Sequence, residues 1–131
     1  MQNGFYLSKK MKNYINSVQG EYDSIICHML RSSQYLPDNF LGTKVLDSTD
    51  LLSSNYFQTI KQLSIFNPLK YIYLIEKFLI YKYEKKVFKK FNNIIFVSNQ
   101  DAKKAKKMVN KKKIYTIGNA KKNVSQLFKH K

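Results

Sequence analysis

Polar side chains follow two short apolar runs of this sequence, and their types suit ligand binding and acid–base chemistry. His28 and Arg31 follow the run SIIC. Asp47 and Asp50 follow the run KVL. Short apolar runs bounded by turn residues are typical of strands buried on both faces of a parallel sheet. Ligands of open α/β sheets bind just beyond the carboxyl ends of such strands. The sequence therefore predicts a binding cleft lined by Arg31, Asp47, Asp50 and Ser53.

Arg31 is the only arginine of the sequence, so its position carries more information than that of any lysine. A guanidinium group can hold an acidic or phosphorylated ligand through two parallel hydrogen bonds. The alternative is a structural ion pair.

Other combinations of side chains offer less chemistry. His28 and His130 are far apart and neither belongs to an H-x-x-x-H pair, so we predict no metal site. Glu76 and Glu84 lie two turns apart on one predicted helix, and we interpret them as structural acids. Such acids can bond to loop backbone or pair with lysine. The spacing supports no Ser-His-Asp or Cys-His arrangement.

Hydrophobic periodicity and capping residues predict the elements that must position these side chains. The predicted strands are residues 24–28, 43–46, 94–97 and 114–117, and the long loop between the first two has a helical turn near residues 34–36. The predicted helices are residues 5–18, a segment capped by Ser53 or Ser54 that ends before Asn67, residues 69–91 after Pro68, and residues 99–109 after the cap Ser98.

This alternation predicts an α/β fold, a Rossmann-like partial domain in which short parallel strands are flanked by helices. A chain of 131 residues can form one domain with a core but hardly two. We assign residues 1–119 to this domain and the lysine-rich residues 120–131 to a frayed basic tail. Because the first predicted element is a helix that leads into a strand, we expect the sequence to be an excerpt of a larger α/β domain.

The composition limits the classes of function. The formal net charge is +16, and nearly all of the basic residues are lysines, a bias that an AT-rich genome also produces. Such a charge attracts nucleic acid or an anionic lipid surface. The alternative is that the lysines of residues 82–90 and 103–113 lie on solvated helix faces. The single cysteine, Cys27, and the lack of a signal-peptide or membrane-spanning pattern favour a reducing cytoplasm.

Five segments together resemble the amino-terminal domain of family-4 retaining glycosyltransferases, which have the two-lobed GT-B fold. They are YDSIICHMLR with the following QYL, KVLDSTDLLSSNY, EKFLIYKYE, NNIIFVSNQD and IYTIGN. The most specific part is a D-x-x-D-x-x-S-x-x-Y block ahead of Y-E and F-V-S-x-x-D. The resemblance spans residues 5–119 and implies an incomplete GT-B amino-terminal lobe.

The resemblance implies transfer of a sugar from a nucleotide-sugar to a glycan or lipid-linked acceptor, with retention and without a metal or other cofactor. In such hexosyl- and related glycosyltransferases the amino-terminal lobe contacts mainly the acceptor, whereas the other lobe holds most of the nucleotide-sugar donor. This sequence lacks the family's first strand and glycine-rich loop, stops where the second lobe begins, and reads Asn119-Ala120 in place of Asn-Gly. We therefore expect the chain to be inactive alone, either as a truncated gene product or as a split half that needs a donor-lobe partner chain.

The resemblance also implies roles for single residues. Asp50 is the catalytic candidate, because a carboxylate past the second strand can orient an acceptor hydroxyl or accept its proton. The alternative is that Asp47 and Asp50 cap the loop before the helix that follows. Ser98 resembles the family's strand-end serine, although a helix cap explains it without chemistry. The acceptor-binding candidates are Arg31, Tyr35, Asp47, Ser53 and Tyr56.

Two other classes of function stay open. A basic nucleic-acid-binding protein fits the sequence pI near 9.9. However, the aromatic residues fall at core spacing and arginine is nearly absent, so we expect no specific nucleic acid partner. A peripheral membrane protein would place residues 82–90 on anionic lipid headgroups. That class is compatible with the glycosyltransferase hypothesis, which places the protein in the cytoplasm or at the inner face of the cell membrane, building a cell-surface polysaccharide or glycolipid.

Overall fold

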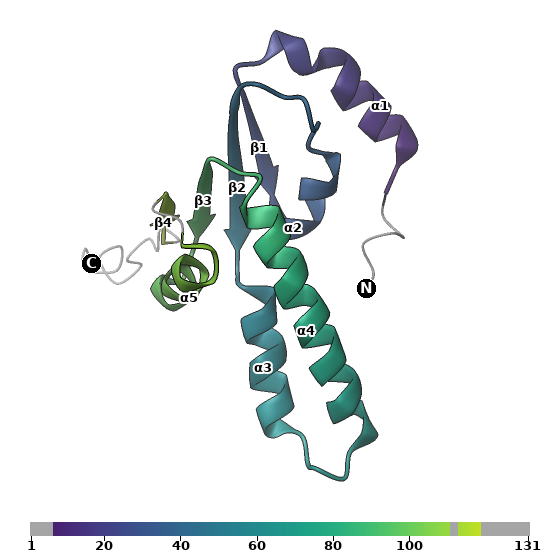
Figure 1. The fold of residues 1–131 in the computed structure, drawn as a ribbon, viewed down its shortest axis with the longest axis vertical. Coiled ribbons are helices and arrows are strands. Elements are labelled where there is room, and N and C mark those ends of the chain that lie inside the picture. Colours follow the sequence, from purple (N-terminus) through teal and green to yellow (C-terminus); the bar gives the residue numbers. More distant parts are fainter. Residues whose placement is uncertain (1–6, 111–112, 119–131) are drawn as a thin grey trace, which may run out of the picture.

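The computed structural model describes residues 7–110 and 113–118 and contains a four-stranded parallel sheet. The strands lie in chain order across the sheet and are β1 (Ser24–His28), β2 (Thr43–Thr49), β3 (Asn93–Phe96) and β4 (Ile114–Thr116). Helices flank this sheet (Figure 1). The predicted α/β class, with short parallel strands and flanking helices, is confirmed. The predicted tail, residues 120–131, lies outside the described residues, as does the predicted start of the first helix at Phe5.

The sequence between and before the strands forms helices at most of the predicted places. The first two strands are joined by a short helix and a 3₁₀ turn where the sequence predicted a loop with one helical turn. The helices are α1 (Lys9–Val18), α2 (Met29–Ser32), α3 (Leu52–Gln62), α4 (Pro68–Phe88) and α5 (Asn99–Val109), and the 3₁₀ turns are Gln19–Glu21 and Ser33–Tyr35.

Local capping explains where α4 and α5 begin. The hydroxyl of Ser98 accepts hydrogen bonds from two backbone N–H groups of the first turn of α5, at 3.2 and 3.5 Å. Asn67 caps α4 in the same way, with its Oδ1 accepting from the backbone N of Leu69 at 3.0 Å, and Pro68 stands in the first turn. Because these contacts are local, the sequence predicted both starts, and the predictions for Pro68 and Ser98 are confirmed.

The helices that pack on the sheet cover only one of its faces. Alternate strand residues enter a single core together with residues of α2, α4 and α5. On the opposite face, Ile26 and Tyr115 are 70% and 50% exposed. Burial on both faces, which the sequence predicted, is therefore wrong for the described part of the chain. Each connection steps to the next strand in the same direction, and right-handed crossovers then place all of their helices on the same side.

Strand β2 is longer than the sequence predicted. It was expected to end at Leu46 but continues to Thr49, because it pairs with β1 on one side and β3 on the other. Its ladder with β3 is irregular between Asp47 and Thr49. Asp47 therefore lies within the strand and not beyond its end, which corrects the position predicted for this candidate residue.

The start of α3 also differs from the prediction. Its N-cap position is Leu51, which offers no side-chain hydrogen bond, and Ser53 and Ser54 lie buried in the first turn. The prediction that one of these serines caps the helix is wrong. The backbone N of Ser53 instead donates to Oε1 of Glu84, a residue of α4, at 3.3 Å. A contact between residues so distant in sequence cannot be recognised from local capping rules.

Helices α3 and α4 form a hairpin that projects beyond the carboxyl ends of the strands (Figure 1). Within it the rings of Tyr56 and Tyr73 meet edge to face, with their centroids 5.8 Å apart. Only the last part of α4 enters the core, through Val87 and Phe88, and many apolar residues nearer its start are exposed. No helix within residues 7–110 and 113–118 is both long enough and apolar enough to cross a membrane.

Truncation of a core aromatic residue should destabilise this fold far more than truncation at the hairpin tip. Phe96 of β3 is fully buried, and its ring meets that of Phe88 edge to face with centroids 5.9 Å apart. Phe96→Ala should lower the free energy of unfolding by about 3–5 kcal/mol. Phe66 is 90% exposed, so Phe66→Ala should change it by less than about 0.5 kcal/mol. Urea denaturation measures both values, and equal losses would contradict this location of the core.

Candidate functional site

The carboxyl ends of β1 and β2 meet at one edge of the sheet. At the end of each strand one residue has a positive φ angle. Met29, directly after β1, has a φ angle of 64°, and Thr49, the last residue of β2, has a φ angle of 56°. Left-handed backbone is strained for residues other than glycine, and particularly for a β-branched residue such as threonine. Each such residue costs about 1–3 kcal/mol, and they concentrate at functional sites.

The strained end of β2 presents Asp50 to solvent. The backbone N of Asp50 donates to the carbonyl of Ser48 at 2.6 Å, and the hydroxyl of Ser48 donates to the carbonyl of Asp50 at 3.1 Å. These two contacts close a tight turn. The side chain of Asp50 in this turn is exposed. An exposed carboxylate at the carboxyl end of a parallel strand can accept hydrogen bonds from the hydroxyl groups of a sugar.

Two further candidates, Arg31 and Tyr56, lie close enough to interact electrostatically, and Tyr56 also contacts Glu76. The hydroxyl of Tyr56 donates to Oε2 of Glu76 at 3.3 Å. Burial and the Glu76 carboxylate raise the pKa of Tyr56 above its ordinary value, whereas the Arg31 guanidinium acts to lower it. Arg31 of α2 is therefore within electrostatic reach of the α3–α4 hairpin. A guanidinium, a phenol and a carboxylate together can bind vicinal hydroxyls or an acidic group on a sugar.

Asp47 belongs to a different surface, the uncovered face of the sheet. Its Oδ2 lies 2.8 Å from Nδ1 of His28, its neighbour in the register between β1 and β2. Both side chains reach solvent, with 65% of the His28 side chain and 33% of that of Asp47 exposed. A carboxylate that holds an imidazole in this way can orient it for proton transfer. The sequence suggested no such pair, because only the register places these two residues side by side.

The remaining two candidates, Tyr35 and Ser53, lie apart from Arg31 and Tyr56. The Tyr35 hydroxyl accepts a hydrogen bond from the backbone N of Ser8 at 3.0 Å, so it holds the start of α1. Ser53 is 5% exposed and lines a cleft between α3, α4 and α5. Ser53 and Tyr56 are three residues apart in α3 but contact different residues, since Tyr56 packs against Tyr73 and donates a hydrogen bond to Glu76. The structure thus divides the predicted acceptor-binding residues among several surfaces.

Glu84 takes the capping role that the sequence offered to Asp47 and Asp50. It is fully buried, and the backbone N of Ser53 donates to its Oε1 at 3.3 Å, whereas its Oε2 has no hydrogen-bond partner among the described residues. Burial raises the pKa of Glu84 from its ordinary 4.5 to about 7, although the polar groups of Ser53 and Leu52 act to lower it, and the carboxylate of Asp101 raises it further. The interpretation of Glu84 as a structural acid that bonds to loop backbone is confirmed.

Comparison with known proteins does not place this chain in a family. No family model, no curated protein and no solved structure matches it. The glycosyltransferase resemblance therefore stays a prediction from sequence motifs. Among the described residues no group of three or more His, Cys, Asp or Glu side chains is arranged to hold a metal ion.

The raised pKa of Glu84 should make stability fall as the pH rises. Because the folded state holds this proton more tightly than the unfolded state, its stabilising effect is complete below about pH 4.5 and is lost by about pH 7. The loss amounts to roughly 3 kcal/mol, at about 1.4 kcal/mol per pKa unit. Glu84→Gln should remove this component and leave the variant more stable than the wild type above pH 7.

Urea denaturation between pH 4 and pH 8 tests this prediction through the difference between variant and wild type at each pH. Glu76→Gln is the matched control, since Glu76 is a partly exposed acid of the same helix. Its difference from the wild type gives the effect of removing a carboxylate from α4 outside the core. A Glu84→Gln variant whose stability follows the wild-type pH profile would contradict the prediction, because it would show that the pKa of Glu84 is the same in the folded and unfolded states.

Proposed function

We propose that this chain is the acceptor-binding lobe of a retaining glycosyltransferase similar to family 4, acting in the synthesis of a cell-surface polysaccharide or glycolipid. The observation that carries the proposal is the strained backbone at the carboxyl ends of β1 and β2. Met29 and Thr49 both adopt left-handed backbone there, and the turn after β2 exposes Asp50. This is the edge at which open parallel sheets bind their ligands, and the motif D-x-x-D-x-x-S-x-x-Y begins in the same stretch.

In this proposal the side chains have distinct roles. Asp50 orients the acceptor hydroxyl that attacks the donor sugar and accepts its proton. Arg31 and Tyr56, on the side of the hairpin that carries Glu76, bind further hydroxyls or an acidic group of the acceptor. The nucleotide-sugar is held by a partner lobe. The four glycines of the sequence are isolated from one another, so the sequence offers no glycine-rich loop to hold a diphosphate.

A glycan array followed by calorimetric titration with the tightest-binding glycan tests this proposal. Asp50→Ala should weaken binding of that glycan at least about tenfold, because a hydrogen bond to a charged group contributes roughly 1.5–3 kcal/mol. Asp38→Ala is the control: it removes an exposed carboxylate in the loop before β2, which pairs with Lys90 at 3.0 Å. That variant should bind the glycan like the wild type.

The proposal fails if no glycan binds, or if Asp50→Ala and Asp38→Ala bind equally well. A second variant separates catalysis from binding. With a donor-binding lobe supplied in trans, Asp50→Asn keeps a hydrogen-bonding side chain but cannot accept the proton. Its turnover should fall about 100-fold while its unfolding midpoint stays unchanged.

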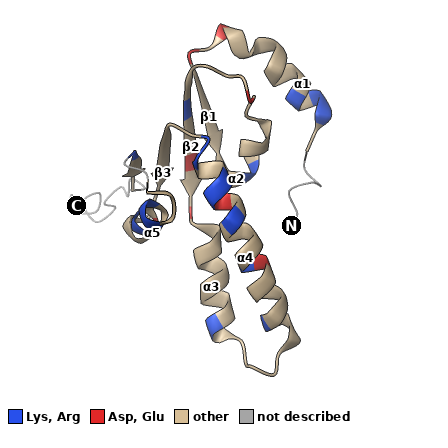
Figure 2. Cartoon of the chain, viewed as in Figure 1, with Lys and Arg blue, Asp and Glu red and all other residues tan. Residues whose placement is uncertain are grey.

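A second observation, the surface of the α3–α4 hairpin, favours membrane attachment. Between residues 52 and 91 the sequence has eight lysines and only two acids, Glu76 and Glu84, the second of which is buried. Figure 2 shows basic residues at several places on α4 and, on α3, only near the end that faces the tip. At its tip, Ile65 and Phe66 are 63% and 90% exposed. The apolar tip residues, together with Lys61 and Lys70 at the helix ends next to the tip, supply the two signals that peripheral binding to an anionic bilayer needs.

We therefore propose that the lobe works at the inner face of the cell membrane, with the hairpin tip inserted among anionic headgroups. Co-sedimentation with vesicles of phosphatidylcholine, with and without phosphatidylglycerol, tests this. The chain should bind the anionic vesicles and release them at high salt. The double substitution Ile65→Ser and Phe66→Ser should weaken binding at least about tenfold, since each side chain contributes roughly 1.5–3 kcal/mol on burial.

Leu41→Ser is the matched control, because Leu41 is 100% exposed but lies in the loop before β2 and not in the hairpin. It should leave vesicle binding unchanged. If the tip variant sediments like the wild type, the lysines alone attract the lipid, and insertion of the tip is disproved.

A further inference from the structure

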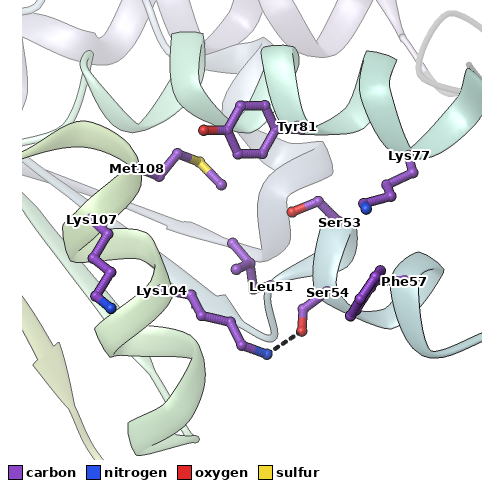
Figure 3. Close-up of a pocket in the computed structure, with 9 residues that line it drawn as sticks. All are labelled: Leu51, Ser53, Ser54, Phe57, Lys77, Tyr81, Lys104, Lys107 and Met108. Carbon is purple, nitrogen blue, oxygen red and sulfur yellow. Dashed lines mark hydrogen bonds between the residues drawn. The ribbon is translucent and has the colours of Figure 1, made fainter. Parts of the chain in front are cut away.

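A cleft lies between α3, α4 and α5, on the side of the hairpin that faces α5 (Figure 3). Its volume is about 340 Å³, within the usual range for small-molecule sites. It is independent of the surface formed by Arg31, Tyr56 and Glu76, since none of these residues lines it. The cleft is therefore a separate candidate for ligand binding.

Three ammonium groups line this cleft, from two different helices. Lys77 belongs to α4, and Lys104 and Lys107 belong to α5. No Asp or Glu of the described ranges lines the cleft. Asp101 is nearby, but its Oδ1 is 3.9 Å from Nζ of Lys104, at the limit of an ion pair. Like charges that converge in a concave site repel one another, and a bound anion would relieve that repulsion.

Contacts within the cleft hold two of these lysines in place. Nζ of Lys104 donates to the hydroxyl of Ser54 at 2.6 Å, as the dashed line in Figure 3 shows. Because this hydroxyl accepts from Lys104, its own hydrogen remains able to donate to a ligand. Nζ of Lys77 lies 4.3 Å from the centre of the Phe57 ring. A hydrogen bond and a cation–π contact thus favour one placement for two of the ammonium groups, next to a hydroxyl donor.

The rest of the lining is apolar and suits a ligand with a carbon skeleton. The exposed lining surface is more apolar than polar. The thioether of Met108 supplies deformable apolar surface, and the Phe57 ring adds flat apolar surface where the ammonium groups of Lys61 and Lys77 do not cover it. A bare inorganic anion would leave this surface against water. A neutral apolar molecule would leave the ammonium groups without a counter-charge.

We propose that this cleft binds a phosphate monoester of a small apolar or aromatic group, with Lys77, Lys104 and Lys107 around the phosphate and Phe57 and Met108 against the carbon skeleton. Such a phosphate carries nearly two negative charges at neutral pH and several acceptor oxygens. The ligand can be a soluble aryl phosphate or the headgroup of a phosphatidic acid, because both have this chemistry. The proposal stands whether or not the chain serves a glycosyltransferase.

Binding of four probes to the full chain tests the proposal by calorimetric titration, with amide shifts in ¹⁵N-resolved NMR spectra to locate each site. The probes are phenyl phosphate, dihexanoyl phosphatidic acid below its micellar concentration, inorganic phosphate and phenol. At least one of the two monoesters should bind at least about tenfold more tightly than inorganic phosphate and phenol, and should shift the amides of Ser54 and Lys104. The tighter monoester identifies the source as soluble or lipid.

A matched pair of variants separates this site from the general attraction of a chain with a net charge of +16. Lys104→Gln with Lys107→Gln removes two cleft charges, and Lys103→Gln with Lys106→Gln removes two exposed charges of the same helix that do not line the cleft. The first pair should weaken monoester binding at least about tenfold and the second less than about twofold. Equal effects of the two pairs, phenol binding as tight as the best monoester, or no binding of either monoester would each overturn the proposal.

Discussion

Each connection between consecutive strands leads to the neighbouring strand in the same direction across the sheet. The rest of the structure depends on this constraint. A right-handed crossover between parallel strands fixes the side on which its helix lies. With the order β1-β2-β3-β4, the same side recurs at every step, so α2, the end of α4 and α5 share one core. The strand ends also gather at one edge. That edge is where Asp50 is exposed and where the α3–α4 hairpin begins.

The hairpin projects from this edge, and the buried Glu84 helps to join it to the sheet. Its carboxyl group accepts a hydrogen bond from the backbone at the start of α3. That start follows closely on the strained Thr49 that ends β2. A buried carboxyl group is costly when it is ionised. Burial therefore raises the pKa of Glu84 to about 7, and the backbone N of Ser53 donates a hydrogen bond to its carboxyl group. The same contact therefore positions the first turn of α3. Ser53 and Ser54 of this turn line the cleft between α3, α4 and α5.

The sequence was a good guide wherever the cause of a structure is local. The strand at residues 24–28, the helix after Ser98 and the helix start at Pro68 follow from apolar runs and capping residues a few positions away. The sequence failed where the cause is a distant residue. Glu84 replaces the expected serine cap of α3 from 31 residues away, and pairing with β3 extends β2 past Leu46.

The candidate site was harder to predict than the fold for the same reason. The type of each polar residue at a strand end is visible in the sequence, but its neighbours depend on register and on which face of a helix it occupies. Asp47 was expected in the cleft with Asp50, yet the strand register turns it to His28 on the uncovered face. The uncovered face itself follows from the crossover direction, which no single motif encodes.

The α3–α4 hairpin shows how one backbone can carry two chemically different surfaces. Consecutive residues of a helix point about 100° apart, so neighbours in sequence can serve different sides. Tyr56 packs with Tyr73 and bonds Glu76, whereas the next residue, Phe57, lies under Lys77 in the cleft beside α5. The consecutive residues Glu76 and Lys77 also face different surfaces. Glu76 lies on the side of Tyr56, and Lys77 lines the cleft. The surface of Tyr56 therefore includes a carboxylate, whereas the lining of the cleft contains lysines and no acid of the described ranges.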